Sequence, residues 1–400
     1  MRMSRTLAYC ILVFVMAGLP AEVFGRIKLI TLPVRERVEI QLDNPNATLV
    51  EEERIVPLVK GENQVDFSWA NTQIDAASIV FRVIAPVEGK NLDVKVLSVS
   101  YPPNEAALVW AVSSSDSGSA RVRISYILGN LGKSFNYRAV AANDESTLTL
   151  SQYMRLQNFA NEDFGSTGLW AGFGKEFLRP IGLNETKEML MAKFAAVPIQ
   201  KTYTCDPVEF GYIDRPQNKL RVPMHYVLKN EKAANLGAAA LPFGKVRIFI
   251  EGAGAEKTTT FLGEDWGKFT PIDDEMKLYL GVAQDIVVKR TIDRNNNTRV
   301  AGNLSAQELV IKYEIENFKD KAVSLDVTES VRAIRNEVRP DNGRDVQWEL
   351  GGETTFEGGR DAEKSTFDKL VFHVKLPARD KDGKAEKITQ KLHVLLKNEW

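Results

Sequence analysis

The side chains with the clearest potential for chemistry lie between Gly263 and Pro271, where Glu264, Asp265 and Trp266 follow one another. Two carboxylates beside a large amphipathic ring suit a polar ligand or the backbone of a partner protein. The glycines in this segment permit an irregular loop, and loops carry a large share of binding residues. We therefore predict that these three residues form part of a ligand or partner surface. The alternative is a long hairpin connection whose Trp266 packs into the edge of a sandwich.

Pairs of carboxylates raise a second possibility, a hydrolase that acts on envelope polysaccharide. Such an enzyme needs two carboxyl groups that face each other across the sugar, but neighbours on one strand point to opposite faces of the sheet. A catalytic pair would therefore come from separate loops, with tryptophan rings available to stack on sugars. The acidic groups are Asp144–Glu145, Glu162–Asp163, Glu264–Asp265 and Asp273–Glu275, and the tryptophans are Trp110, Trp170 and Trp266.

Other catalytic patterns are missing from the sequence. The chain has no G-x-S-x-G elbow that would position a nucleophilic serine. His225, His373 and His393 share strand parity with charged side chains, which predicts solvated histidines. We assign no catalytic residue. Cys205 has no partner once the N-terminal segment is removed, so we expect a buried, inert thiol or, alternatively, a reactive one.

Metal and cofactor sites are not predicted. Two cysteines and three histidines are too few for a closed structural zinc site. Asp293–Asn297 and Asp380–Gly383 lack the spaced acidic ligands of a calcium loop, and Gly252–Gly254 lacks the third glycine of a dinucleotide fingerprint. With 52 basic and 53 acidic residues the net charge is -1, so nucleic acid is not an expected partner.

Alternation of apolar and polar residues along short segments dominates the rest of the chain and predicts half-buried antiparallel strands. Turns rich in Gly, Pro, Asn and Ser separate these segments, a spacing typical of a sandwich or barrel. We predict an all-β protein with two antiparallel β-sandwich-like domains, an N-terminal one over residues 26–160 and a C-terminal one over 219–400. Examples of the alternation are Val38–Leu42, Val65–Trp69, Ala120–Tyr126, Lys245–Glu251 and Leu309–Glu316.

Residues 161–218 are expected to connect the two domains and to contain a short helix. Asn184 is a plausible N-cap for a helix over 185–197, and Pro198 would end it. The apolar residues at helical spacing are Leu190, Met191, Phe194 and Val197.

The N-terminus has the pattern of a secretory signal peptide. Two arginines precede the apolar run Leu7–Leu19, and Val23 and Gly25 fit the small-residue cleavage positions. The run is shorter than the roughly 20 apolar residues of a spanning helix, although an uncleaved anchor is the alternative. We expect removal of residues 1–25 and export to the periplasm, the cell envelope or the medium, with no later membrane span.

A series of motifs runs in order through the C-terminal half: Leu241–Phe249, Phe261–Asp265, Leu278–Gly281, Asp285–Arg290 and Tyr313–Asp320. Over roughly residues 200–400 the chain resembles the C-terminal domain of the mucoidy inhibitor A-like envelope proteins, a domain of unknown function. The resemblance implies a secreted or envelope-associated β protein with no established activity, and it supplies no catalytic residue. The long helical segment that the family often carries between two N-terminal β portions is missing from this sequence.

Two functional hypotheses follow. The first is a non-enzymatic envelope protein whose β-sandwiches bind a protein partner or a surface glycan. The second is the carboxylate-dependent hydrolase. Two carboxyl groups from separate loops within one cleft would favour the enzyme, and a flat surface would favour binding.

Overall fold

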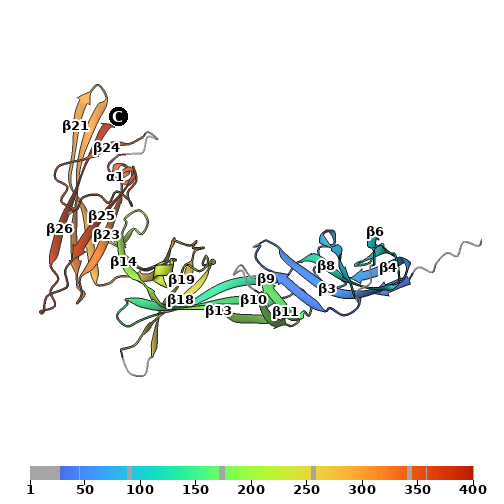
Figure 1. The fold of residues 1–400 in the computed structure, drawn as a ribbon. Coiled ribbons are helices and arrows are strands. Elements are labelled where there is room, and N and C mark those ends of the chain that lie inside the picture. Colours follow the sequence, from blue (N-terminus) through green and yellow to red (C-terminus); the bar gives the residue numbers. More distant parts are fainter. Residues whose placement is uncertain are drawn as a thin grey trace, which may run out of the picture. The chain divides into compact units, whose positions relative to one another are not determined.

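The computed structural model describes residues 28–44, 46–87, 92–170, 176–253, 258–339, 345–356 and 358–399. The predicted signal peptide, residues 1–25, lies outside this part of the chain. The fold is all-β, as predicted, with five sheets and, among the described residues, one α-helix (Figure 1). Within the same residues, no helix has the length and apolar character needed to cross a bilayer.

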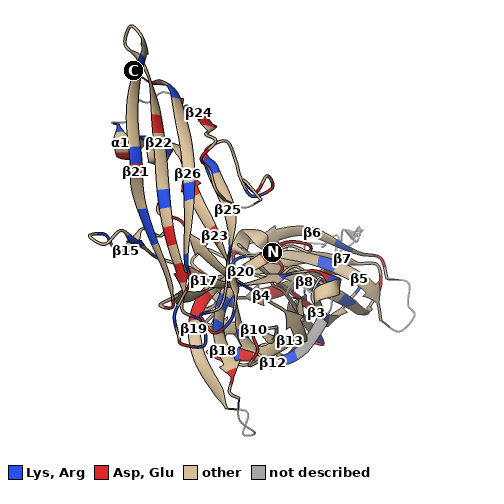
Figure 2. Ribbon diagram, turned by 90° about the vertical axis from the view of Figure 1, so that its left-hand side faces the viewer, with Lys and Arg blue, Asp and Glu red and all other residues tan. Residues whose placement is uncertain are grey.

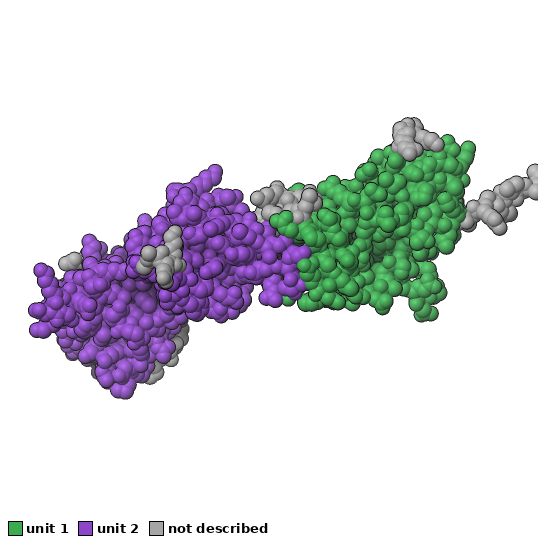
Figure 3. Space-filling model, turned by 90° about the horizontal axis from the view of Figure 1, so that it is seen from below, with its two compact units in different colours: residues 1–132, 157–185 green, residues 133–156, 186–400 purple. Residues whose placement is uncertain are grey.

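The chain forms two compact units that are interleaved in sequence (Figure 3). Unit 1 takes residues 1–132 and 157–185, and unit 2 takes 133–156 and 186–400. Each unit therefore draws on two separate stretches of chain. They differ from the contiguous segments 26–160, 161–218 and 219–400 that alternation alone suggests.

Unit 1 contains a four-stranded sheet, β1-β4-β7-β6, and a six-stranded sheet, β12-β11-β2-β3-β8-β5. The two sheets share an apolar interior, because Phe67 of the first lies 5.9 Å from Tyr126 of the second, and Trp110 of the first lies 4.7 Å from Phe81 of the second, between ring centroids. The elements are β1 (Lys28–Thr31), β2 (Arg37–Gln41), β3 (Thr48–Leu58), β4 (Gly61–Ser68), the 3-10 helix η1 (Ala76–Ser78), β5 (Val80–Pro86), β6 (Val94–Ser100), β7 (Ala107–Ser114), β8 (Gly118–Leu128), β11 (Gly165–Trp170) and β12 (Glu176–Ile181).

Unit 2 contains three sheets, with strand orders β13-β10-β9-β18-β19, β20-β17-β14-β23-β25 and β15-β16-β21-β22-β26-β24. Its elements are β9 (Leu131–Ala141) and β10 (Thr147–Asn158), which begin or end at the boundary, then β13 (Thr186–Pro198), β14 (Gln200–Cys205), β15 (Tyr212–Asp214), β16 (Lys219–Leu220), β17 (Pro223–Lys229), the 3-10 helix η2 (Lys232–Ala234), β18 (Gly244–Glu251), β19 (Thr259–Gly267), β20 (Glu275–Val282), β21 (Ile286–Ala301), β22 (Leu304–Asn317), β23 (Val323–Ser330), α1 (Val331–Val338), β24 (Gln347–Leu350), β25 (Lys369–Leu376) and β26 (Lys387–Glu399).

The second and third sheets of unit 2 pack face to face around one large core. Leu325 and Phe372 come from one sheet, and Val288, Leu309 and Leu392 come from the other. Basic and acidic residues recur along β21, β22 and β26 (Figure 2), between buried apolar residues. This is the one-dry, one-wet pattern that produces period-two alternation in the sequence.

The first sheet of unit 2 packs its inner face against strands β17 and β20. Tyr137, Val246 and Ile248 of this sheet share a core with Tyr226 of β17 and Leu278 of β20. Strand β18 pairs in parallel with β9 and antiparallel with β19. The outer face of β18 and β19 is left to solvent, and β19 lies beside β20.

The helix predicted over residues 185–197 is wrong, because the structure has strand β13 there. Leu190, expected on the buried face, is 51% exposed. Lys, Glu, Met, Leu and Ala are good helix formers, but intrinsic propensity is a weak preference, and pairing with β10 overrides it. The helix of the structure is α1, which begins at Ser330, whose hydroxyl accepts the amide hydrogen of Ala333 at 3.1 Å. Strand β14, within the predicted connection, is the middle strand of its sheet.

Candidate functional site

Glu264, Asp265 and Trp266 lie in strand β19, not in a loop. Because side chains alternate along a strand, Glu264 and Trp266 share one side and Asp265 points to the other. Glu264 contacts Lys245 on the solvent side, whereas Asp265 reaches the backbone of Tyr279 in β20. The three residues therefore contribute to two different surfaces on either side of β19.

On the solvent side, Trp266 stacks on Phe243, with ring centroids 5.2 Å apart and an interplanar angle of 2°. The ammonium of Lys245 lies 5.2 Å from the centroid of the indole. Trp266 is 53% exposed and Phe243 is 57% exposed. The indole therefore has neighbours in the same sheet but does not pack into the edge of a core.

The same side of the sheet carries a second aromatic group. The guanidinium of Arg138, on β9, lies 5.0 Å from the ring centroid of Phe249. The Phe249 ring meets Phe261 edge-on at 5.5 Å. We call the whole set the outer aromatic face: Arg138, Phe243, Lys245, Arg247, Phe249, Phe261, Glu264 and Trp266.

The outer aromatic face has three cations and one anion, and Glu251, at the end of the same side of β18, adds a second carboxylate, so a small excess of positive charge remains. Glu264 lies 2.8 Å from Lys245 and 3.7 Å from Arg247. The hydrogen bond from Lys245 holds the pKa of Glu264 below its usual value, so this carboxylate remains ionised at neutral pH. These contacts are exposed to water, where an ion pair contributes little to stability.

On the other side of β19, the carboxylate of Asp265 joins two strands. One oxygen accepts the amide hydrogen of Trp266 at 2.8 Å, and the other accepts that of Tyr279 at 2.7 Å. Asp265 also lines an open cavity of about 400 Å³. The other lining residues are Glu209, Phe210, Arg221, Pro223, His225, Tyr279 and Val282.

His225, predicted to be solvated, is buried in the wall of this cavity, with 8% of its surface exposed. Burial, and then the charge of Lys277, lower its pKa to about 4, so the imidazole is neutral at pH 7. Its ring lies 5.6 Å from that of Tyr279 and 6.4 Å from that of Phe210. Its Nδ1 is buried and has no hydrogen-bond partner in the described part of the chain. The prediction fails because β17 is an inner strand of its sheet, between β14 and β20.

His373 lies between two carboxylates, and its side chain is 42% exposed. Nδ1 lies 2.6 Å from Asp326 and Nε2 lies 2.6 Å from Asp361. Partial burial opposes a charge on this ring, but the hydrogen bonds to Asp361 and Asp326 outweigh it and raise the pKa. The pair holds the loop that carries Asp361 against β25.

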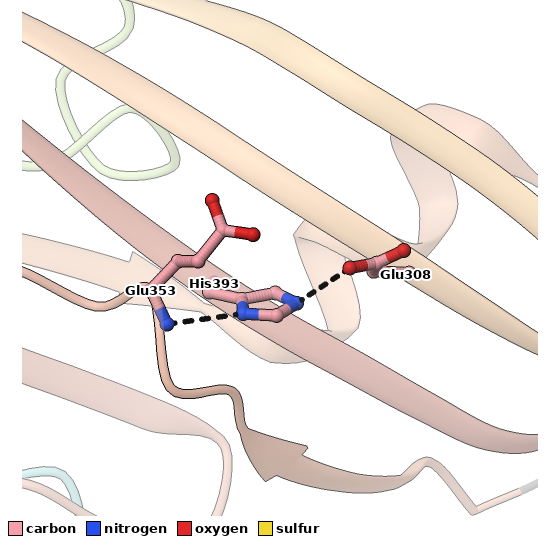
Figure 4. A group of neighbouring side chains, drawn as sticks. All are labelled: Glu308, Glu353 and His393. Atoms are coloured by element: carbon pink, nitrogen blue, oxygen red, sulfur yellow. Dashed lines mark hydrogen bonds and ion pairs between the residues drawn. The ribbon is translucent and has the colours of Figure 1, made fainter.

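Glu308, Glu353 and His393 form a group that could offer one nitrogen and two oxygens to a metal ion (Figure 4). His393, like His225, is buried despite its predicted exposure. Arg294 already pairs with both carboxylates, 3.6 Å from Glu308 and directly with Glu353. Nδ1 of His393 accepts the amide hydrogen of Glu353 at 3.3 Å, so in the neutral ring Nε2, 3.2 Å from Glu308, carries the proton. Arg294 and the Glu353 amide hydrogen therefore already occupy both carboxylates and one imidazole nitrogen, while Nε2 of His393 has no hydrogen bond among the described residues.

Cys205 is fully buried, and burial raises the pKa of its thiol, which leaves it protonated and unreactive. Trp110 is also buried, at 3% exposed, and belongs to the core of unit 1. Of the residues considered for chemistry, the structure brings together Asp265 and His225 at one cavity, and Glu264 and Trp266 on the outer aromatic face.

Sequence reasoning missed most of both surfaces. One signal was readable: Lys245, Arg247, Phe249 and Glu251 share strand parity, so a phenylalanine stands among charged residues on a wet face. The cavity residues come from four separate stretches of chain and leave no such local pattern.

No protein-family model matches the chain, and neither does any curated protein.

Proposed function

We propose that this is an exported, non-enzymatic protein of the cell envelope, related to the mucoidy inhibitor A-like proteins in its C-terminal half, that binds a protein partner through the outer aromatic face. The observation that supports this proposal most is the exposed stack of Trp266 on Phe243 with Lys245 over the indole. Tryptophan and arginine dominate the binding energy of protein interfaces, and here both stand on one open sheet face.

A protein partner fits this face better than the other expected ligand, a surface glycan. Sugars stack on an open aromatic face, but the indole of Trp266 already contacts Phe243 and Lys245. The excess of positive charge favours an acidic partner surface. Its carboxylates would replace Glu264 as the ion-pair partners of Lys245 and Arg247. We therefore expect an acidic protein surface with apolar side chains that cover the exposed rings.

Site-directed crosslinking tests this proposal in the source cell. Phe261, which is 54% exposed, is replaced by the photoreactive p-benzoylphenylalanine, and Phe367, 69% exposed outside this face, serves as the matched control. We expect a discrete crosslinked protein at position 261 that disappears when Trp266→Ala is added, and none at 367. A crosslinked adduct that contains sugar and remains on the peptide after protease digestion would identify a glycan ligand. Equal crosslinking at both positions would contradict the proposal.

The export part of the proposal has its own test. Intact-mass measurement of the exported protein should give a species that lacks residues 1–25. A mature protein that still begins at Met1 would mean that the N-terminal segment is an anchor.

The hydrolase is retained as a second candidate because Glu209 and Asp265, from separate segments, line the same cavity. Against it, each oxygen of Asp265 accepts a backbone amide hydrogen and thereby ties β19 to β20. Release of reducing ends from envelope polysaccharide by the wild type, lost in Glu209→Gln, would establish the enzyme. Equal background release by the two proteins would exclude this pair of carboxylates.

A further inference from the structure

The cavity beside β19 is separate from the outer aromatic face and has no role in the proposed protein binding. It lies within unit 2, and its wall is built by the segment after β14, the start of β17, and strands β19 and β20. Its volume of about 400 Å³ is in the range of sites that bind small molecules.

His225 is the first indication of a ligand. A buried polar atom without a hydrogen bond costs free energy, and such atoms are rare in folded proteins. Nδ1 of His225 is such an atom within the described residues, and its ring forms part of the cavity wall. A neutral imidazole offers one donor and one acceptor. Because Nδ1 is closed off from water in this structure, a ligand hydroxyl reaches it only when the ring turns to bring it into the cavity.

Two charged side chains at the cavity are also available. Arg221 and Glu209 line it, and within the described residues neither side chain has a hydrogen bond or an ion pair. The nearby charges balance, since Glu209 and Asp265 are opposed by Arg221 and by Lys277, which acts on His225. Because these charges balance, the cavity favours neither an anionic nor a cationic ligand. Its side chains still offer hydrogen-bond donors and acceptors in several directions.

The remaining wall is apolar and partly aromatic. Phe210 and Tyr279 flank the His225 ring, and Pro223 and Val282 complete the lining. Aromatic rings accept the C–H face of a sugar ring, while charged and imidazole groups bind its hydroxyls. We propose that this cavity binds a neutral saccharide unit, with His225, Arg221 and Glu209 on its hydroxyls and Tyr279 and Phe210 against its ring.

The test uses the full mature chain labelled with 15N-histidine. The probes are glucose, galactose and N-acetylglucosamine with their β-linked dimers, and the charged comparisons are glucuronic acid and glucosamine. We expect at least one neutral sugar to shift the His225 imidazole signals in a saturable manner while leaving those of His373 in place. The two charged sugars should bind at least tenfold more weakly.

Variants separate a site from nonspecific contact. His225→Phe keeps an aromatic ring and removes both nitrogens, and Arg221→Gln removes the guanidinium charge. Each variant should bind the best neutral sugar at least tenfold more weakly, as measured by ligand-detected NMR. Trp266→Ala, on the outer aromatic face, should leave its affinity unchanged. Failure of every neutral sugar to shift His225, tighter binding of a charged one, or an unchanged affinity in His225→Phe would each overturn the proposal. None of these results bears on crosslinking at Phe261.

Discussion

Two groups of charged side chains in unit 2 contain similar residues but lie in opposite surroundings. In the sandwich core, Arg290 lies 2.5 Å from Glu329 and 2.8 Å from Glu337, and Tyr313 also contacts Glu329. The Arg290 and Glu329 side chains are 3% and 1% exposed. On the outer aromatic face, Lys245 and Glu264 are about as close but open to water.

The difference shows which charges can take part in recognition. The buried group links β21, β22, β23 and α1, and every charged side chain in it already has a partner. Removing one partner leaves another charge stranded away from water. On the outer aromatic face a lost contact is replaced by water, so the same residue types can change partners at little cost.

The largest effect is expected for Arg290→Met, which keeps the length of the side chain and removes its charge. Glu329 is then buried without a cation, and the free energy of unfolding should fall by about 3 to 5 kcal/mol. Urea denaturation measures it. Arg290→Met combined with Glu329→Gln should recover part of the loss. A loss below about 1 kcal/mol in the single variant would mean that the buried group is no costlier to break than the exposed one.

Acidification tests the second polar group removed from water, His225. Its pKa is about 4 in the folded protein and about 6.5 when unfolded, so above pH 6.5 it is neutral in both states. As the pH falls from 6.5 towards 4, the unfolded state gains a proton that the folded state does not, and stability is lost. Urea midpoints at pH 7, 5.5 and 4 should therefore fall more for the wild type than for His225→Gln. Parallel curves would contradict the neutral, buried imidazole.

Trp266→Ala tests the exposed group of side chains, the outer aromatic face. It removes one stacked pair and one cation–π contact, and should cost about 1 kcal/mol, while crosslinking at Phe261 is lost. Trp110→Ala is the matched control in the core and should cost about 3 to 5 kcal/mol. Similar thermal shifts for the two variants would show that the stack on Phe243 holds the sheet together.

His373 should give the smallest effect, with the opposite pH dependence to His225. Its hydrogen bonds to Asp361 and Asp326 raise its pKa despite partial burial. The stabilisation from its charge is thus complete below pH 6.5 and disappears as the pH rises through the raised pKa. Because the side chain is 42% exposed, we expect less than about 1 kcal/mol. Calorimetry of the wild type and His373→Gln between pH 6 and 9 should show two curves that converge on the alkaline side.

The sequence predicts the strands where one face is wet and the other dry. Lys245–Glu251 and Leu309–Glu316 alternate because one side of each strand lies in a core, and both are strands. The segment 186–198 misleads because it alternates poorly: Met189 and Val197 are buried and Ala196 has a positive φ. The order of the strands in a sheet could not be predicted for another reason. The parallel pairing of β18 with β9, for example, depends on contacts between segments that are distant in the sequence.

The candidate site was predictable in position but not in geometry. Two carboxylates and a tryptophan in a row mark β19, but side chains alternate along a strand, which separates Asp265 from Glu264 and Trp266. Phe243 and Lys245 join Trp266 only through the register between β18 and β19. His225 resembles a solvated histidine until the strands on both sides of β17 are known.

The interleaved order of the units has a consequence for synthesis. Tyr137 of β9 donates a hydrogen bond from its hydroxyl to the carbonyl of Pro242, 105 positions later. An emerging chain therefore makes β9 long before its neighbour β18 exists, and the β9 edge can pair with other chains in the meantime. A nascent chain that stalls before Gly244 exposes that edge. Chaperones would be needed most during this interval.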